Sequence, residues 1–313
     1  MIRLTSLFTL AIATSTAFAA EKTDANGDVQ RMPTVNAIDN SILNESMPVG
    51  ETQRPEWTGS RRFPGTRVYI QKEPWEVGIE SWWRIKHHRD GSISNRLLEE
   101  VEIGLPHRIQ LDLYNDIEGD GKGRFHYQSF NIEARWAFAD WGKIWGNPTL
   151  YAEYKIADKH WGPDVYEFKM LFGDQFAERF HWGVNFVWEA ETGGEREQEF
   201  QVTGGLSYSL IEGKLGVGVE FLYDHDTVKG ARGEPAHQFN IGPSIQWRVT
   251  ENLHIDASCM FGTNEASDRQ IGFLVVGYDF GGPSGHTDKG AGKNYAPASS
   301  QEHHYIPVSG QHN

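Results

Sequence analysis

The sequence predicts an all-β protein, an antiparallel up-and-down transmembrane β-barrel of about twelve strands. Three observations support this fold class. Apolar and polar residues alternate in runs of roughly ten residues. Polar connections that are alternately short and long separate these runs. Aromatic residues make up 12% of the chain, which suits the aromatic girdles of a membrane barrel.

The alternation places one face of each expected strand in an apolar environment. Near residue 80, Val77, Ile79 and Trp83 share one face, while Glu80 and Arg84 share the other. The same period recurs at residues 100–105, 109–113, 130–138, 150–156, 166–172, 181–189, 199–210, 215–223, 239–249 and 253–261. The last run, 271–280, is apolar on both faces, so the pattern leaves its facing open.

The connections fall into two sets. Those at 106–107, 174–179, 212–214 and 250–252 are short, whereas those at 89–94, 118–124, 159–164, 192–196, 225–235 and 263–267 are longer. Short periplasmic turns and longer external loops are typical of outer-membrane barrels. The connection at 139–148 lies on the short side but carries Trp141 and Trp145. We expect it to rest in the membrane interface, where indoles are stable.

The two ends of the chain differ from the barrel region. Residues 1–19 have the features of a secretory signal peptide: a basic Arg3, an apolar run, and small residues at Ala17 and Ala19. Residues 20–70 are polar and irregular and predict a flexible periplasmic segment, followed by the barrel at 71–280. Residues 281–313 are rich in Gly, Ser and His and predict a disordered tail. This organisation predicts export to the cell outer membrane.

Composition narrows the functional classes. A net charge of −14 argues against nucleic-acid binding, and the single Cys259 excludes an internal disulfide. A mean hydropathy of −0.55 fits either a soluble protein or a membrane barrel. A soluble all-β sandwich or barrel is the alternative fold. Large aromatic residues near the strand ends, and runs longer than the five or six residues usual in soluble sheets, favour the membrane barrel.

If the apolar faces meet lipid, the opposite faces line a lumen. The candidate lumen residues are Glu80, Arg84, Glu100, Glu102, Asp112, Glu133, Arg135, Glu153, Lys155, Glu167, Lys169, Glu189, Glu199, Glu220, Arg248 and Asp256. Together with Lys86 they comprise eleven carboxylates and six cations. A twelve-strand barrel has a backbone radius of about 12 Å. The sequence therefore predicts a narrow, acidic lumen that passes small solutes by diffusion and prefers cations.

A closed barrel is the alternative interpretation of the same charges. Three strands place a carboxylate and a cation two residues apart on one face: Glu133/Arg135, Glu153/Lys155 and Glu167/Lys169. Such pairs can form cross-strand ladders that close the lumen and leave a structural barrel displaying surface loops. The expected partners are outer-membrane lipid, the barrel-assembly machinery and a small solute that the sequence does not identify.

No catalytic residue, metal site or cofactor is predicted. The chain contains neither H-E-x-x-H nor G-x-S-x-G. Asp116 begins a run that resembles a calcium loop, but Tyr127 occupies its twelfth position instead of Glu. A lipid-modifying hydrolase is a third alternative, because some twelve-strand barrels have that activity. His126 and Ser129 are three residues apart, so a regular strand would place them on opposite faces and prevent a proton relay.

Several stretches resemble a known family. They are RWAFADWGK at 135–143, NPTLYAEYK at 147–155, VEIGL at 101–105, RIQL at 108–111 and FNIGPS at 239–244. They are similar to the outer-membrane barrels grouped with the phenol-degradation-pathway (MetA-like) transporters, over residues 75–280. The resemblance implies an outer-membrane channel for small or aromatic compounds, and it assigns no substrate ligand. The aromatic Phe280 suits the end of a last strand, but thirty-three residues follow it.

Overall fold

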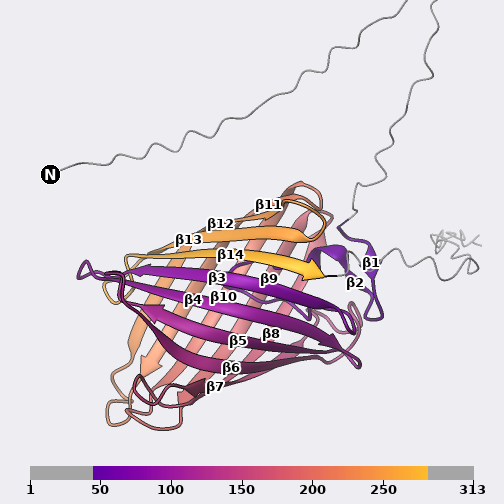
Figure 1. Ribbon diagram of the computed structural model, residues 1–313. Coiled ribbons are helices and arrows are strands. Elements are labelled where there is room, and N and C mark those ends of the chain that lie inside the picture. The colour runs from indigo at the N-terminus through magenta and orange to yellow at the C-terminus, as the bar shows by residue number, and fades with distance from the viewer. Residues whose placement is uncertain (1–44, 281–313) are drawn as a thin grey trace, which may run out of the picture. The chain divides into compact units, whose positions relative to one another are not determined.

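The computed structural model describes residues 45–280, in which twelve antiparallel strands form a closed barrel (Figure 1). The strands are β3 (Val77–His87), β4 (Ile93–Leu105), β5 (Ile109–Gly119), β6 (Phe125–Ala137), β7 (Thr149–Ala157), β8 (Val165–Ala177), β9 (Phe180–Glu191), β10 (Gln198–Ile211), β11 (Leu215–Thr227), β12 (Ala236–Arg248), β13 (Leu253–Gly262) and β14 (Gln270–Phe280). β14 pairs with β3, which closes the ring. The predicted fold is confirmed. The expected signal peptide and C-terminal tail lie outside the described residues.

The strand pattern gives the barrel an apolar outer face. Ile79, Trp83, Ile132, Phe186 and Trp188 are between 39% and 47% exposed, although they are large and apolar. The facing of β14, which the sequence left open, is also settled. Ile271 and Val275 are buried inside the barrel, whereas Val276 and Tyr278 are exposed. Among residues 45–280, no helix has the length and apolar character needed to cross a membrane.

The connections define two ends of the barrel. The turn end carries the connections at 106–108, 138–148, 178–179, 212–214 and 249–252. The loop end carries those at 88–92, 120–124, 158–164, 192–197, 228–235 and 263–269. These sets agree closely with the connections predicted from the sequence. Because the strand number is even, β3 starts and β14 finishes at the turn end, where Figure 1 also shows β1 and β2.

Residues 45–76, here called the internal segment, enter the barrel from the turn end. The segment contains the short strands β1 (Pro48–Val49) and β2 (Arg54–Pro55) and the 3₁₀ helix η1 (Glu56–Thr58). Trp57, Phe63 and Tyr69 are at most 1% exposed. The expectation of a flexible segment over residues 20–70 is therefore wrong for residues 45–70, and residues 20–44 lie outside the described range. The first barrel strand begins at Val77 instead of residue 71.

Inward-facing glycines make room for the internal segment. A β-carbon added at Gly104 would lie 1.9 Å from the Glu73 carbonyl oxygen, and one added at Gly205 would lie 2.4 Å from the Phe63 ring. Both separations are far below van der Waals contact, so any larger residue would displace the segment. The inward-facing glycines on these strands therefore indicate where the internal segment folds back into the barrel.

The connection at 138–148 covers the internal segment at the turn end. The Trp141 ring packs edge-on against Trp57, at a centroid distance of 5.6 Å, and against Tyr69, at 5.3 Å. The Trp141 amide donates a hydrogen bond to the Thr52 carbonyl, 3.0 Å away. The placement of Trp141 in the membrane interface is therefore wrong, because this indole packs on the segment. Trp145 is 81% exposed, so its interfacial position stays a prediction.

Candidate functional site

All sixteen candidate lumen residues have side chains on the inner side of the barrel. Ten are at most 5% exposed: Glu80, Glu100, Glu102, Asp112, Glu133, Arg135, Glu153, Glu167, Glu220 and Asp256. Five further residues line a cavity together with some of these ten: Arg84, Lys155, Lys169, Glu189 and Glu199. The sixteenth, Arg248, donates to Glu56 of the internal segment at 2.9 Å. The structure thus places these residues on the inner wall, while their role in solute passage stays a prediction.

Cations of the internal segment bind the carboxylates of β3 and β4. The pairs are Arg61–Glu80 at 2.5 Å, Arg67–Glu100 at 3.0 Å and Lys72–Glu102 at 3.0 Å. Lys72 also contacts Asp279 near the end of β14. Burial alone would lower the pKa of the Lys72 amine, but Glu102 and Asp279 offset this effect, and the pKa is raised. Lys72 therefore stays charged within the network.

Arg135 extends the same network along β5 and β6. Its guanidinium donates to Glu133 at 2.5 Å and to Asp112 at 2.6 Å. Gln71 of the internal segment accepts from both Arg135 and Arg67, each at 2.8 Å. Glu100 is shared by two groups of three carboxylates close enough to hold a metal ion, Glu80/Glu100/Glu102 and Glu100/Asp112/Glu133. Guanidinium groups contact both trios, so ion pairs use their oxygens.

On the opposite wall, the internal segment contacts β9 to β12. Arg62 donates to Ser207 on β10 and to Gln246 on β12, both at 2.8 Å. The Gly65 amide donates to Glu220 on β11 at 2.8 Å. The Arg67 amide donates to the Asn185 side chain on β9 at 2.8 Å, and that side chain donates back to the Arg67 carbonyl. The segment therefore bridges the lumen from one wall to the other.

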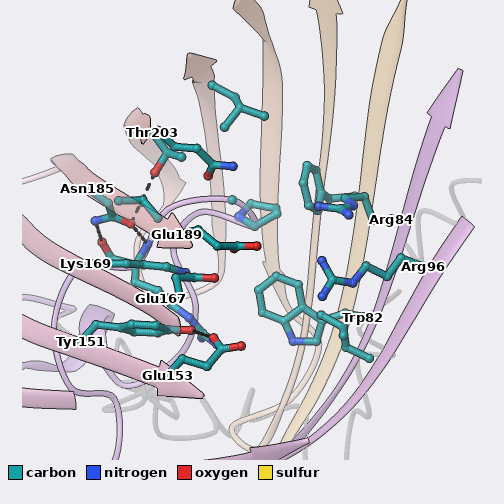
Figure 2. Close-up of a pocket in the computed structure, with 18 of the residues that line it drawn as sticks. Trp82, Arg84, Arg96, Tyr151, Glu153, Glu167, Lys169, Asn185, Glu189 and Thr203 are labelled. Carbon is teal, nitrogen blue, oxygen red and sulfur yellow. Dashed lines mark hydrogen bonds and ion pairs between the residues drawn. The ribbon is translucent and has the colours of Figure 1, made fainter. Parts of the chain in front are cut away.

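A charged cavity of about 260 Å³ lies on the loop side of the internal segment (Figure 2). Pro64 and Gly65 belong to its lining, together with seven cationic and eight acidic side chains from the segment and the strands. Lys155 pairs with Glu167 at 2.9 Å and with Glu189 at 2.7 Å. Trp82 also lines the cavity, and the Arg61 guanidinium carbon lies 3.5 Å from the centre of its ring. Charge of both signs thus surrounds the space.

The expected ladders form only in part. Within single strands, Arg135 pairs with Glu133 and Lys169 pairs with Glu167. Across strands, Lys155 of β7 pairs with Glu167 of β8 at 2.9 Å. Among the described residues, no ion pair joins Lys155 to Glu153 of its own strand. Glu153 lies opposite Glu167 in the register, and its carboxylate accepts a hydrogen bond from the Tyr151 hydroxyl instead. The cross-strand register, which the sequence does not reveal, places Glu153 opposite both Glu133 and Glu167 and so limits the ladder.

Sequence reasoning missed the basic residues of the internal segment. Arg61, Arg62, Arg67 and Lys72 all lie inside the barrel and are at most 9% exposed. A signal was present, because residues 54–72 contain five basic residues and only one acidic residue. This charge is complementary to the acidic inner face of the strands. Arg96 was also missed; it pairs with Asp116 across β4 and β5.

His126 and Ser129 lie on the same face of β6, contrary to the prediction. Tyr127 pairs with Ile117 and Ser129 pairs with Asp116, so a bulge at Gln128 shifts the register by one residue. The two side chains still do not bond to each other. His126 shares a hydrogen bond with Gln128 at 3.1 Å, and its ring stacks on that of Trp161 with the ring centroids 3.7 Å apart.

Comparisons with known proteins support the family resemblance. The model of the family described as "Putative MetA-pathway of phenol degradation" matches residues 152–295, so the resemblance predicted from the sequence is confirmed over this region. No curated protein matches the chain at a significant level.

Solved structures share the barrel fold. An outer-membrane channel from Pseudomonas putida F1 has a TM-score of 0.53 and 9% sequence identity, covering 68% of this chain and 98% of the channel. The KdgM porin in complex with disordered oligogalacturonate has a TM-score of 0.45 and 8% identity, covering 65% of this chain and 99% of the porin. At these identities the likeness concerns the fold alone.

Proposed function

We propose that the protein is an outer-membrane channel for small solutes, and that its internal segment controls passage. One observation carries this proposal: the barrel encloses a charged cavity at the loop end, while residues 45–76 fill the lumen at the turn end. The likeness in fold to an outer-membrane channel supports the same class.

The outer face supports a location in the outer membrane. Large apolar side chains are exposed around the barrel, and aromatic residues lie near strand ends, for example Phe180 and Tyr208 at the turn end. Lipid would cover such a surface, whereas a soluble protein rarely leaves so large an apolar area in water. The family resemblance supports the same location.

Cation preference is the finer part of the proposal. One region of the inner wall is crowded with carboxylates: Glu80, Glu100, Glu102, Asp112 and Glu133. Within this region the strands supply one guanidinium group, that of Arg135. The other cations of this network, Arg61, Arg67 and Lys72, belong to the internal segment. Whenever the segment moves aside, the exposed wall is acidic, and it then attracts cations.

A reversible crosslink tests whether the segment must move. A β-carbon at Gly183 would lie 3.1 Å from Val68 Cγ2, which keeps the Cβ–Cβ separation near that of a disulfide. We would oxidise the variant Val68→Cys/Gly183→Cys in a Cys259→Ser background and record its current in planar bilayers. We expect the oxidised form to pass less than a tenth of the wild-type current, and reduction to restore it. Each single-cysteine variant is the matched control.

Three other outcomes are informative. Equal current in the oxidised and reduced forms would show that solutes pass beside a stationary segment, which contradicts the gating role. A reversal potential that indicates anion preference in a salt gradient would contradict the acidic pathway. The second candidate function, a closed structural barrel, is favoured by the buried ion pairs that join the segment to both walls. It would be supported if neither the wild type nor the reduced variant passed current.

A further inference from the structure

Two guanidinium groups face the cavity side by side. Arg84 on β3 lies directly opposite Arg96 on β4 in the strand register, and Figure 2 shows both on one wall. Arg96 donates to Asp116 at 2.7 Å. Arg84 makes neither a hydrogen bond nor an ion pair with any residue in the range 45–280. Like charges directly opposite each other destabilise a sheet, so this pair favours an anion between its members.

Carboxylates without complete partners lie on the other wall. Asp224 on β11 lines the cavity and is 5% exposed, yet its Oδ1 atom accepts no hydrogen bond from the described residues. Glu199 on the neighbouring strand β10 also lines the cavity and is paired in register with Glu189 on β9. A buried carboxylate oxygen without a donor is costly, and an ammonium group would satisfy it.

The topology sets these two walls against each other. In the closed ring of strands, β10 is six steps from β4 in either direction, and β11, which carries Asp224, is four steps from β3 and five from β4. Figure 2 shows Glu189 across the cavity from Arg84 and Arg96. Apolar side chains complete the lining, among them Leu98, Met260 and Phe273. The volume of about 260 Å³ is slightly below the range of roughly 300–1,000 Å³ that small-molecule sites span, so only a small solute would fit.

We propose that this cavity binds an amphoteric solute of the amino-acid class. Its carboxylate lies between Arg84 and Arg96, its ammonium group donates to Asp224, and an apolar side chain contacts Leu98 and Phe273. This inference rests on the proposed channel function and names the class of solute that the channel takes. A solute with only one charge would leave the opposite wall unsatisfied.

Three solutes of nearly equal shape test the proposal. Leucine carries both charges, leucinamide lacks the carboxylate, and 4-methylpentanoate lacks the ammonium group. We would measure the binding of each to the full-length protein in detergent by isothermal titration calorimetry. We expect the Kd of leucine to be at least ten-fold lower than the Kd of either analogue, because only leucine satisfies both walls.

Variants of the cavity test which wall binds the carboxylate of the solute and which binds its ammonium group. In Arg84→Gln, leucine and leucinamide should bind within two-fold of each other, whereas Arg84→Lys should keep the preference for leucine. In Asp224→Asn, leucine and 4-methylpentanoate should bind within two-fold of each other. Arg124→Gln is the control, because Arg124 lies on the exposed loop at 120–124, outside the cavity. A shift in electrophoretic mobility between heated and unheated samples would confirm that each variant is folded.

The results separate this inference from the channel function. Equal affinity of the wild type for all three solutes, or a preference for leucine that survives Arg84→Gln, would overturn the amphoteric site. Leucine binding without current in bilayers would overturn the channel and leave the site standing. Current without a preference for leucine would overturn the amphoteric site and leave the channel function standing.

Discussion

Arg135 shows how strongly the lumen depends on single charges. Its side chain is fully buried and donates to both Glu133 and Asp112. Burying a charge is costly unless a partner compensates it, and the cost of losing one partner falls on the group that remains. Here two carboxylates depend on one guanidinium group, so the stability of the barrel is more sensitive to Arg135 than to any exposed ion pair.

Substitution of Arg135 tests this dependence. Arg135→Met leaves Glu133 and Asp112 without their main cation, and we expect it to destabilise the folded barrel by about 3–5 kcal/mol. Urea titrations of folding into lipid vesicles would measure the change. Arg124→Met removes an exposed pair with Asp120 and should leave the unfolding transition unchanged. Equal effects of the two substitutions would show that the buried network contributes little.

The internal segment is the element that sequence periodicity could not place. Strands such as β3 and β11 were predictable because their faces alternate and their neighbours follow in chain order. Residues 45–76 have no such period, and their partners lie far along the chain, as in the contact of Arg62 with Gln246. Their docking depends on charge complementarity and on inward glycines, and neither signal is local. The cavity could not be predicted either, because its shape depends on the segment.

Gly205 tests how the segment is held. Gly205→Val would place a side chain where the Phe63 ring lies, so Phe63 must leave its site. We expect the single-channel conductance to rise several-fold while the barrel still folds. Gly272→Val is the control, since the nearest atom to a β-carbon there is 4.0 Å away. A conductance that stays at the wild-type level in both variants would show that Phe63 does not restrict the pathway.

At the scale of the whole molecule, the barrel is inverted relative to a soluble protein. Its polar and charged residues, such as Asp112 and Asp256, are buried, while residues such as Ile132 and Trp136 are exposed. The sequence revealed this inversion because period-two alternation sorts residues between two faces whatever the surroundings. It could not reveal which polar residues are satisfied by a strand neighbour and which by the internal segment.

Two positions on one strand test the lipid-facing surface. Ile132 lies near the middle of β6 and Phe125 begins it, and both are exposed on the outer face. Ile132→Lys should destabilise the barrel in vesicles by about 2–4 kcal/mol, because the proposed membrane position puts this charge near the bilayer midplane. Phe125→Lys should cost about 0–1 kcal/mol near the interface. Equal costs at the two positions would contradict the proposed membrane position.

The short link between the internal segment and β3 has a kinetic consequence. Trp75 and Glu76 bond to Gly104 through backbone hydrogen bonds of 2.7 and 2.9 Å, and Val77 already belongs to the barrel wall. A segment that leaves its site therefore stays attached beside it, and it returns as a tethered ligand at a high effective concentration. A soluble peptide of the same sequence would compete poorly with it. Openings of the pathway should accordingly be brief and self-terminating, and their duration is set by the chain itself.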